Sequence, residues 1–454
     1  MERVLIANRG EIACRIIRSC RALGLETVAI YSEADQDALH VELADGAEPI
    51  GPAAARQSYL NIDAVLAAAR AARADAIHPG YGFLAENPRF AERVEAEGLT
   101  WIGPRPKTIE DMGDKERARL LARAAGVPVL PGSPRFGAHD VSGLEEEAAR
   151  VGYPLLVKAA AGGGGIGMQR VDAPDKLASV VDSTQKMAER AFGDGTVYLE
   201  RLVPKARHVE IQVFGFGDGH AVHLFERECS IQRRFQKIIE ETPAPGLPED
   251  ARRQMAEAAA ALAAQERYRG AGTVEFVVDA ESGEFFFLEM NTRIQVEHPV
   301  TEMTTGLDLV ALQIRLARGD DLSDLRQEKI RPRGSAIECR IYAENPSKMF
   351  LPSPGPLEVF RLPEPAEGIR IDAGVREGDR ITPHYDPLIA KLVCHGADRR
   401  EAIGRSLAAL RASAIEGIHS NLPFLMRVLE HPAFQAGDVH TGFVDAHRPQ
   451  LMTT

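Results

Sequence analysis

Apolar runs and amphipathic segments alternate at the start of the chain. RVLIAN is a short apolar run, and in the next segment, RGEIACRIIRSCRALG, apolar side chains recur at helical spacing at Ile12, Ile16, Ile17 and Cys20. ETVAIYS is a second apolar run, so the opening predicts a β-α-β unit. ADAIHPGYGFLAEN and LTWIGP extend this pattern and predict a parallel, Rossmann-like sheet up to about residue 115. No Gly-x-Gly-x-x-Gly follows the first strand, which favours a scaffold sheet over a dinucleotide site.

A small separate unit follows, between two clusters of turn-forming residues at 125–134 and 199–206. It contains LLVKAAAGGGGIGMQRV, where a predicted strand ends at Lys158 and leads into a run of glycines. This is not the P-loop pattern, but consecutive glycines can direct several backbone N–H groups at one anion and let a loop close over a ligand. A flexible hairpin tip is the simpler interpretation. The lysine before the glycines favours a phosphate site.

Beyond residue 205 the pattern becomes that of antiparallel strands. HVEIQV alternates apolar and polar residues strictly, and HAVHLFERECSIQRRFQKIIEE predicts a second long strand. Its basic run, Arg233, Arg234 and Lys237, is by itself typical of a solvated face.

GTVEFVVDAESGEFFFLEMN predicts a hairpin. If residues 280–284 form its loop, residue 279 pairs with 285, and Glu275 falls directly opposite Glu289. Two like charges in that position are destabilising unless something positive lies between them.

The polar residues after FFF recur at alternate positions, so in an extended chain they share one face: Glu289, Asn291, Arg293, Gln295 and Glu297. One interpretation is a salt-bridged strand end in which Arg293 neutralises its neighbours. The other is a cation site, because two carboxylates and the Asn291 amide oxygen form an all-oxygen set suited to Mg²⁺. Such an ion normally keeps phosphate oxygens as further ligands, which agrees with a phosphate site at Lys158.

The bulk composition narrows the class of protein. With 454 residues, 44% hydrophobic and 26% charged, the chain is typical of a globular protein of about two to four domains. A net charge of -12 gives no long-range attraction for nucleic acid or an anionic membrane. MERVLIANRG lacks signal-peptide order and no apolar run approaches about 20 residues, so we expect a cytoplasmic protein without nucleic-acid or membrane partners. The five scattered cysteines predict core thiols.

The chain resembles the biotin carboxylase family of ATP-grasp enzymes through motifs that cover nearly its whole length: ANRGEIACRIIR, IHPGYGFLAEN, MGDK, KAAAGGGGIGM, RHVEIQV, ERECSIQRRFQKIIEE, EMNTRIQVEHPVTE, ECRIYAENP and LPSPG. The resemblance implies a protein of α/β and α+β class with the ATP-grasp fold. Its parts would be a Rossmann-like pre-ATP-grasp domain at 1–115, a linker helix and mobile glycine-rich lid at 116–204, an ATP-grasp catalytic domain at 205–332 and a C-terminal biotin carboxylase domain at 333–447.

The resemblance also implies a nucleotide site and a metal site. The implied nucleotide-binding residues are Lys115 and Lys158 at the phosphates, Gly164 and Gly165 in the loop above them, Glu200, Arg201, Leu202 and Val203 along the adenine, and His208 and Gln232 on the ribose and phosphate side. The metal, Mg²⁺ or Mn²⁺, would be held by Glu275, Glu289 and Asn291, which agrees with the hairpin argument.

Bicarbonate and biotin sites are implied in the same way. Bicarbonate would be bound by Lys237, Arg293 and the Val296 backbone, with Glu297 as the base. Biotin would be bound by Tyr81, Gly82 and Arg340.

The implied reaction converts ATP, bicarbonate and biotin into carboxybiotin, ADP and phosphate through carboxyphosphate. Attack of bicarbonate on the γ-phosphorus needs a positioned carboxylate to remove a proton, the role of Glu297, and cations to neutralise the phosphoryl oxygens. Carboxyphosphate would then break into CO₂ and phosphate, and the departing phosphate would take the ureido proton of biotin. The enolate-like oxygen that develops would be stabilised by Arg340 in a site closed to water.

Two positions depart from the family pattern. Ile166 stands in the glycine loop where Arg or Lys is usual, and Phe235 stands where His is usual. Both lie on the nucleotide side, so they bear on nucleotide affinity or on the choice of acyl acceptor system.

Partners are expected because parts of the full reaction are missing. The chain lacks Met-Lys-Met, the usual setting of a biotinylated lysine, and 454 residues leave no room for a carrier or carboxyltransferase domain. We therefore expect a separate biotin carboxyl carrier protein and carboxyltransferase subunits, as in multi-subunit acetyl-CoA and other acyl-CoA carboxylases. The resemblance further implies a homodimer.

Two other functions stay open at this stage. A different ATP-grasp ligase, joining a carboxylate to an amine, would share the lysines and acidic metal ligands, but would have no reason to keep RIQVEH together with Arg340. A non-catalytic nucleotide-binding relic would explain Ile166 and Phe235.

Overall fold

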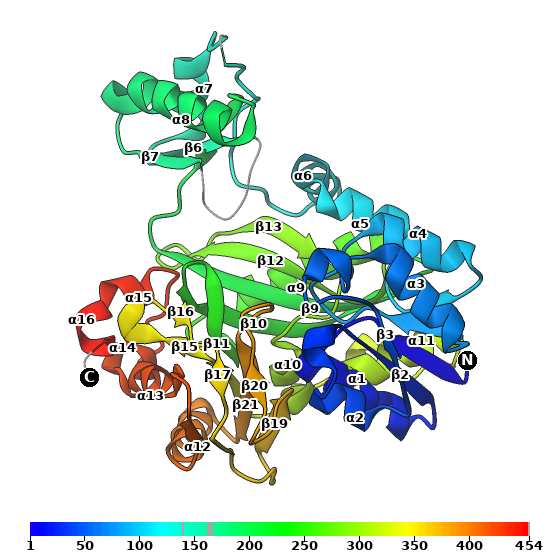
Figure 1. Ribbon diagram of the computed structural model, residues 1–454. Helices are drawn as coiled ribbons and strands as arrows, with labels where there is room; N and C mark the ends of the chain where they lie inside the picture. Colours follow the sequence, from blue (N-terminus) through cyan, green and yellow to red (C-terminus); the bar gives the residue numbers. More distant parts are fainter. Residues whose placement is uncertain (139, 161–166, 453–454) are drawn as a thin grey trace.

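The computed structural model describes residues 1–138, 140–160 and 167–452 (Figure 1). Its N-terminal region is a parallel sheet of order β3-β2-β1-β4-β5. The strands are β1 Arg3–Ile6, β2 Glu26–Tyr31, β3 Gly46–Pro49, β4 Ala76–His78 and β5 Thr100–Trp101. The helices are α1 Gly10–Ala22, α2 Leu39–Leu43, α3 Ile62–Ala71, α4 Pro88–Ala96 and α5 Pro106–Gly113. The predicted β-α-β opening is confirmed, because the apolar stripe of α1 is buried against the rest of the fold.

A small unit with its own core follows α6 Lys115–Ala124 and stands apart at the top of Figure 1. It consists of α7 Leu144–Val151, β6 Leu155–Ala159, β7 Met168–Val171, α8 Leu177–Phe192 and β8 Val197–Arg201. Its strands form an antiparallel sheet of order β7-β6-β8. Gly164, Gly165 and Ile166 lie outside the described residues.

The largest sheet is antiparallel, of order β13-β12-β9-β10-β11-β14-β21-β19. Its strands are β9 Ala206–Phe216, β10 Ala221–Arg233, β11 Gln236–Thr242, β12 Arg269–Asp279, β13 Phe285–Asn291, β14 Ser335–Tyr342, β19 Ile369–Ala373 and β21 Leu388–Gly396. Helix α9 Glu249–Gln265 packs on one face of β9 with Val209, Ile211 and Val213. Helix α10 His298–Thr305 packs against β10, β11, β14 and β21, and on this side of the sheet Arg227 joins Glu210 and Gln212 of β9 to Thr301.

Shorter elements complete the chain. They are α11 Leu309–Arg318, β15 Glu344–Asn345, β16 Leu351–Pro352, β17 Gly355–Pro356, β18 Val359–Arg361, β20 Arg380–Ile381, α12 Arg399–Arg411, β22 Ala414–Glu416, α13 Leu422–Glu430, α14 Pro432–Gln435, α15 Phe443–Ala446 and α16 Arg448–Leu451. Single 3-10 turns lie at Glu33–Asp35, Ala55–Gln57, Pro174–Lys176, Gln327–Lys329 and Pro346–Lys348.

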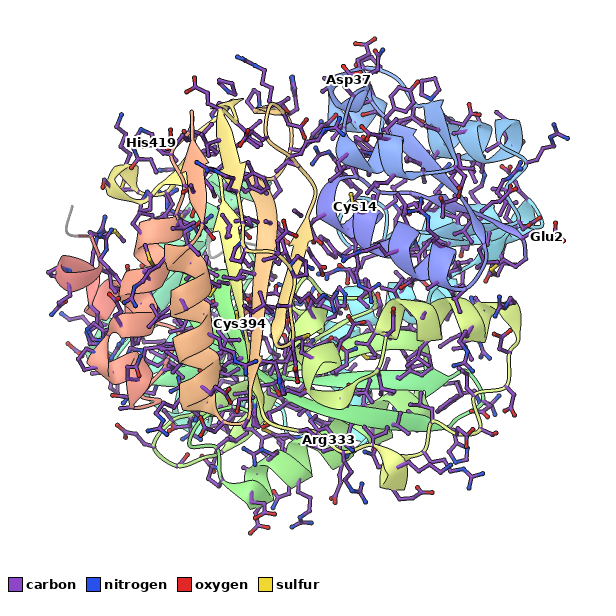
Figure 2. All side chains as sticks on the ribbon, turned by 90° about the horizontal axis from the view of Figure 1, so that it is seen from below. Glu2, Cys14, Asp37, Arg333, Cys394 and His419 are labelled. Carbon is purple, nitrogen blue, oxygen red and sulfur yellow. The ribbon has the colours of Figure 1, made fainter. Side chains whose placement is uncertain are left out.

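The cysteine prediction is confirmed. All five cysteines are buried and free. Figure 2 shows two of them in different regions, Cys14 on α1 and Cys394 on β21. Among the described residues, no helix is both long and apolar enough to cross a membrane.

Three local predictions were wrong. The long strand predicted at 220–241 is a hairpin, β10 and β11, which turns at Arg234 and Phe235, both with positive φ (48° and 64°). In the β12–β13 hairpin, Phe285 pairs with Val278, and a bulge at Leu288 restores the predicted pairing of Glu275 with Glu289. The extended chain ends at Asn291, because the backbone then turns into α10.

Candidate active site

A cavity of about 900 Å³ lies where the N-terminal region, the large sheet and the C-terminal strands meet. The structure brings twelve of the predicted site residues into its lining: Tyr81, Gly82, His208, Gln232, Lys237, Glu275, Glu289, Asn291, Arg293, Val296, Glu297 and Arg340. All five residues of the predicted polar face, Gln295 included, are in this lining although the strand ends at Asn291.

The two hairpin carboxylates lie opposite each other, as predicted. Burial and the charge of Glu275 raise the pKa of Glu289. No described residue donates a hydrogen bond to the Glu289 carboxylate, whereas the Glu275 carboxylate accepts hydrogen bonds from Lys237 at 2.8 Å and Gln295 at 2.8 Å. The ionised Glu289 is therefore short of positive charge, which a divalent cation would supply.

Asn291 is oriented differently from a metal ligand. Its amide nitrogen donates to Glu275 at 2.9 Å, and its oxygen accepts from Arg293 at 3.0 Å. The side chain of Asn291 would have to turn to offer its oxygen to an ion beside Glu275 and Glu289.

Lys237 lies at the centre of the cluster. Its Nζ is 2.6 Å from Glu210, 2.8 Å from Glu275 and 2.7 Å from Glu297. The expectation of a solvated basic run was wrong for Lys237 and also for Arg233, whose guanidinium is buried against Glu344 and lies 5.0 Å from the centre of the Tyr342 ring. The hairpin turn explains this, because the chain reverses within the run and sends both side chains inward.

Glu297 is fully buried and precedes α10. Burial alone would raise the pKa of Glu297, but the cations of Lys237 and Arg340 hold that pKa far below its usual value. Arg340 contacts Glu297 at 2.9 Å and also pairs with Glu240. The Arg340 Nε is buried without a hydrogen-bond partner among the described residues.

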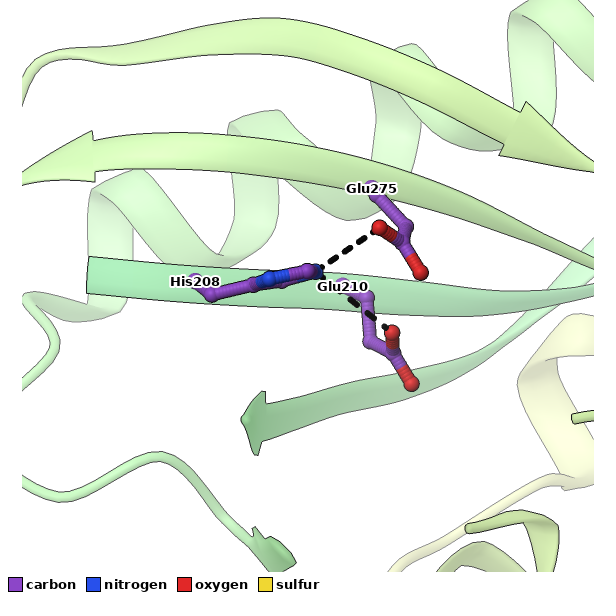
Figure 3. A group of neighbouring side chains, drawn as sticks. All are labelled: His208, Glu210 and Glu275. Carbon is purple, nitrogen blue, oxygen red and sulfur yellow. Dashed lines mark ion pairs between the residues drawn. The ribbon is translucent and has the colours of Figure 1, made fainter. Parts of the chain in front are cut away.

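Figure 3 shows His208, Glu210 and Glu275 converging from β9 and β12. The His208 Nε2 is 2.9 Å from Glu275 and 3.9 Å from Glu210. Atoms this close could hold a metal ion. The Lys237 ammonium already bridges the same two carboxylates, so we interpret this group as an ion-pair network rather than the metal centre.

The neighbouring groups are held in place by further contacts. The Arg293 Nε donates to Glu86 at 2.8 Å. Tyr81 donates to Glu11, and Gly82 has a left-handed backbone with φ of 69°. The N–H of Val296 has no acceptor among the described residues.

Among the described residues, none of the predicted nucleotide residues of the small unit lies in the cavity lining. Lys158 pairs with Glu200 across β6 and β8, while Arg201 is exposed and Val203 is buried. Lys115, at the first turn of α6, is exposed, and its charge acts to lower the pKa of Glu289. The small unit stands apart from the large sheet, which agrees with this separation (Figure 1).

The buried residues that hold Glu210 in the Lys237 cluster were not predicted from the sequence. Arg227, fully buried, contacts Glu210 at 2.6 Å, Gln212 at 2.6 Å and Thr301 at 3.0 Å. The alternation in HVEIQV placed Glu210 and Gln212 on a polar face, but nothing indicated that this face is buried. Arg227 carried no signal, since it lies within a strand that reads as ordinary.

These features define an ATP-grasp enzyme: an antiparallel sheet with acidic residues at a cavity, and a small glycine-containing unit joined to it. Family models match the chain at 1–109 ("Biotin carboxylase, N-terminal domain"), 114–325 ("Carbamoyl-phosphate synthase L chain, ATP binding domain") and 338–446 ("Biotin carboxylase C-terminal domain"). The chain belongs to the biotin carboxylase family, the ligases that carboxylate biotin in an ATP-dependent reaction.

Individual relatives support this family assignment. Biotin carboxylase 1 of Bacillus subtilis is 49% identical over 450 residues, 98% of this chain and 99% of the relative. The alpha subunit of mitochondrial methylcrotonoyl-CoA carboxylase of Rattus norvegicus is 48% identical over 454 residues, and the chain spans only 63% of its length.

A solved structure shows the same fold. The biotin carboxylase domain dimer of 2-oxoglutarate carboxylase from Hydrogenobacter thermophilus, in complex with MgADP, ADP and bicarbonate, matches with a TM-score of 0.91 and 44% identity, covering 100% of this chain and 99% of that one.

Proposed function

We propose that the chain catalyses the biotin carboxylation half-reaction of a larger carboxylase, with bicarbonate as the carbon source and carboxyphosphate as the intermediate. The observation that carries the proposal is the buried cluster at the cavity wall in which Lys237, Glu297 and Arg340 meet. It combines an anion-binding cation, an ionised base and a second cation in one place, the set that this chemistry requires.

Bicarbonate would lie between Lys237, Arg293 and the Val296 N–H. The ion pairs with Lys237 and Arg340 hold the pKa of Glu297 low and keep its carboxylate ionised at neutral pH, the state that a base needs. Lys237 holds the base at 2.7 Å and would stay beside the carbonate oxygen as it attacks the γ-phosphorus. Lys237 would thus orient both Glu297 and bicarbonate.

The donor set at the hairpin fits Mg²⁺ or Mn²⁺, which Glu275 and Glu289 would hold, joined by Asn291 once its amide turns. The bound ion would neutralise phosphate charge during transfer. Before an ion binds, Lys237 and His208 keep Glu275 ionised, because they hold the pKa of Glu275 well below the usual range in spite of burial.

Biotin would bind against Tyr81, Gly82 and Arg340. The Arg340 guanidinium would donate to the ureido oxygen, where negative charge develops when the proton on nitrogen leaves. Glu297 and Glu240 hold the guanidinium in place from the other side.

The nucleotide would be bound between the large sheet and the small unit, which acts as a mobile lid. Lys115, Lys158, Gly164 and Gly165 would contact the phosphates. Glu200, Arg201, Leu202 and Val203 would line the adenine, with His208 and Gln232 on the ribose and phosphate side; Gln232 already donates to His208 at 2.9 Å. The division of the chain at 115, 204 and 332 belongs to the same proposal.

The biotin substrate would arrive on a separate biotin carboxyl carrier protein, and carboxyltransferase subunits would complete an acyl-CoA carboxylase. The relatives include a methylcrotonoyl-CoA carboxylase subunit and a pyruvate carboxylase subunit, so the acceptor is left unassigned. A homodimer is supported by the dimeric neighbour from Hydrogenobacter thermophilus.

The test is ATP hydrolysis by the purified chain with and without bicarbonate and free biotin. The proposal expects hydrolysis that requires bicarbonate and rises when biotin is added. Hydrolysis that is independent of both, or that responds only to an amine substrate, would contradict it and point to another ATP-grasp reaction.

A further inference from the structure

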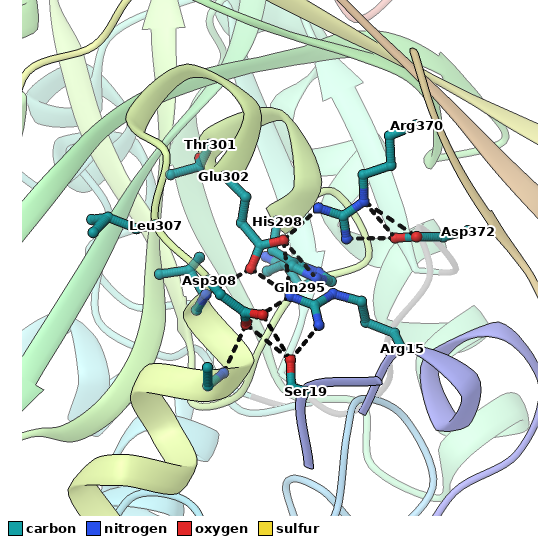
Figure 4. A network of polar contacts seen from close by, with 12 residues as sticks. Arg15, Ser19, Gln295, His298, Thr301, Glu302, Leu307, Asp308, Arg370 and Asp372 are labelled. Carbon is teal, nitrogen blue, oxygen red and sulfur yellow. Dashed lines mark hydrogen bonds and ion pairs between the residues drawn. The ribbon is translucent and has the colours of Figure 1, made fainter. Parts of the chain in front are cut away.

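Two buried side chains hold the backbone at the proposed bicarbonate site. The His298 Nδ1 lies 2.7 Å from the carbonyl oxygen of Gln295, as Figure 4 shows. The Lys391 Nζ donates to the carbonyl oxygen of Val296 at 2.8 Å. His298 and Lys391 are both 0% exposed. Successive peptide oxygens are therefore each held by one side chain.

His298 acts here as a neutral donor. A carbonyl oxygen can only accept, so the proton of the ring lies on Nδ1. Burial and the nearby cations of Lys391, Arg15 and Arg370 hold the pKa of His298 well below its usual value, which keeps the ring uncharged.

Lys391 is fixed by the C-terminal strands. It lies on β21 directly opposite Arg340 on β14. Its Nζ is 3.2 Å from Glu11 and 4.0 Å from Asp372, so two carboxylates balance its charge. Glu11 in turn accepts the Tyr81 hydroxyl, which links this lysine to the wall of the proposed biotin site.

Because a peptide unit is planar, these two contacts also orient the backbone N–H groups of the segment. The Gln295 oxygen and the Val296 N–H belong to one planar unit, and the Val296 oxygen and the Glu297 N–H belong to the next. Fixing the oxygen of a planar unit fixes the direction of its N–H. His298 thereby aims the Val296 N–H, and Lys391 orients the backbone from which the Glu297 side chain projects.

The segment needs such support because residues 292–297 form neither strand nor helix. Two long backbone hydrogen bonds reach this segment, from the His298 N–H to the Gln295 oxygen and from the Val300 N–H to the Glu297 oxygen, both at 3.3 Å. The Val296 oxygen has no such backbone donor among the described residues, and buried backbone groups without partners are costly. We propose that His298 and Lys391 are positioning residues that clamp two consecutive peptides, the first presenting its N–H to bicarbonate and the second setting the place of the base. This inference rests on the proposed function.

The test compares Lys391→Met, His298→Leu and His298→Asn in the bicarbonate-dependent ATPase assay. Lys391→Met and His298→Leu each remove one hydrogen bond to the backbone, and we expect each to raise the KM for bicarbonate about tenfold. His298→Asn keeps an amide donor near the position of Nδ1 and should stay within about threefold of the wild type. ADP affinity should change by less than about twofold in all three, since none of these residues faces the nucleotide.

Arg399→Met is the matched control for the loss of a buried ion pair. Arg399 on α12 pairs with the buried Glu241 on β11 at 2.6 Å, and neither residue lines the cavity. This variant should lose stability as the clamp variants do and keep the wild-type KM for bicarbonate.

Equal KM values for bicarbonate in the wild type, Lys391→Met and His298→Leu would overturn the clamp. So would a KM in Arg399→Met raised as much as in the clamp variants, because the effect would then follow stability alone. If the clamp variants fold too poorly to assay, Lys391→Arg, which keeps the charge and a donor, should retain the wild-type KM, and an altered KM there contradicts the inference. Failure of the proposed function is distinguishable, since the wild type itself would then show no bicarbonate dependence.

Discussion

At Glu297, burial and ion pairing act on one carboxyl group in opposite directions. Burial favours the protonated form, but Lys237 and Arg340 outweigh it and the pKa falls. At Glu240, on the other side of Arg340, burial wins and the pKa rises to about 7. The two carboxyl groups that pair with Arg340 thus differ in pKa, and Glu297 is the one that stays ionised for its proposed role as the base.

The raised pKa of Glu240 predicts a pH-dependent penalty. A carboxyl group whose pKa is higher in the folded state favours folding at low pH, and this contribution is lost as pH rises from about 4.5 to about 7. Relative to Glu240→Gln, which does not titrate, the wild type should lose roughly 1 to 3 kcal/mol of unfolding free energy between pH 5 and pH 8. Urea unfolding of both proteins at the two pH values measures this. A difference that does not change with pH would contradict the assignment.

Glu289 should matter for catalysis and little for folding. Glu289→Gln removes a proposed carboxylate ligand and also its repulsion with Glu275, so we expect ATP cleavage at saturating ATP to fall about 100-fold while the melting temperature holds or rises. Glu284→Gln, at an exposed site before the same strand, is the control and should behave as wild type. Full activity of Glu289→Gln at ordinary magnesium would remove Glu289 from the metal site.

At the scale of elements, the hairpin turn at Arg234 and Phe235 is the least expected feature. Both residues have positive φ, the geometry that two-residue hairpins usually obtain with Asn and Gly. No Gly, Asn or Pro stands there to indicate a turn, which is why a single long strand was predicted. The Phe235 ring is 74% exposed at the cavity, so it gains little from packing in this structure.

Phe235→Gly should therefore leave the stability unchanged or raise the free energy of unfolding by up to about 1 kcal/mol, because strain is relieved and no buried contact is lost. Phe225→Gly is the matched control: Phe225 also has a positive φ, of 68°, but its ring packs edge-on against His223 at 5.2 Å. That variant should be destabilised. A loss of more than about 1 kcal/mol in Phe235→Gly would show that its ring packs in the free protein.

The β12–β13 hairpin shows which parts of a strand pairing can be predicted from the sequence pattern. Counting from the loop placed Glu275 opposite Glu289, which the structure confirms. The route to this pairing was wrong, because the strands start one residue out of the predicted register and the Leu288 bulge restores it. The hydrophobic alternation does not reveal a bulge. The predicted pairing of Glu275 with Glu289 is correct because the one-residue register error at the loop and the unpredicted bulge cancel.

At the scale of the whole molecule, charged pairs join regions that are far apart in sequence. Arg15 on α1 contacts Glu302 at 2.9 Å and Asp308 at 2.8 Å, and Glu302 also contacts Arg370 on β19 at 2.6 Å (Figure 4). The fold class and the local units could be predicted from periodicity and motifs. This network could not, because no local pattern identifies partners that meet only when the chain folds.

Breaking the network should be costly. Arg15→Met leaves Glu302 buried with less compensation, and we expect the free energy of unfolding to fall by about 3 kcal/mol. Arg253→Met removes exposed pairs with Asp250 and Glu257 and should leave the free energy of unfolding nearly unchanged. Thermal unfolding followed by circular dichroism compares them. Equal effects would mean that the Arg15 pairs are no more valuable than surface ones.

The most direct test of the central claim follows the atoms of bicarbonate. The protein is incubated with ATP, free biotin and bicarbonate labelled in carbon and in oxygen, and carboxybiotin and phosphate are analysed. The account predicts labelled carbon in carboxybiotin, one labelled oxygen transferred to phosphate through carboxyphosphate, and a rate about 100-fold lower in Glu297→Gln. Phosphate released without oxygen from bicarbonate, or carboxybiotin formed equally fast by Glu297→Gln, would contradict it.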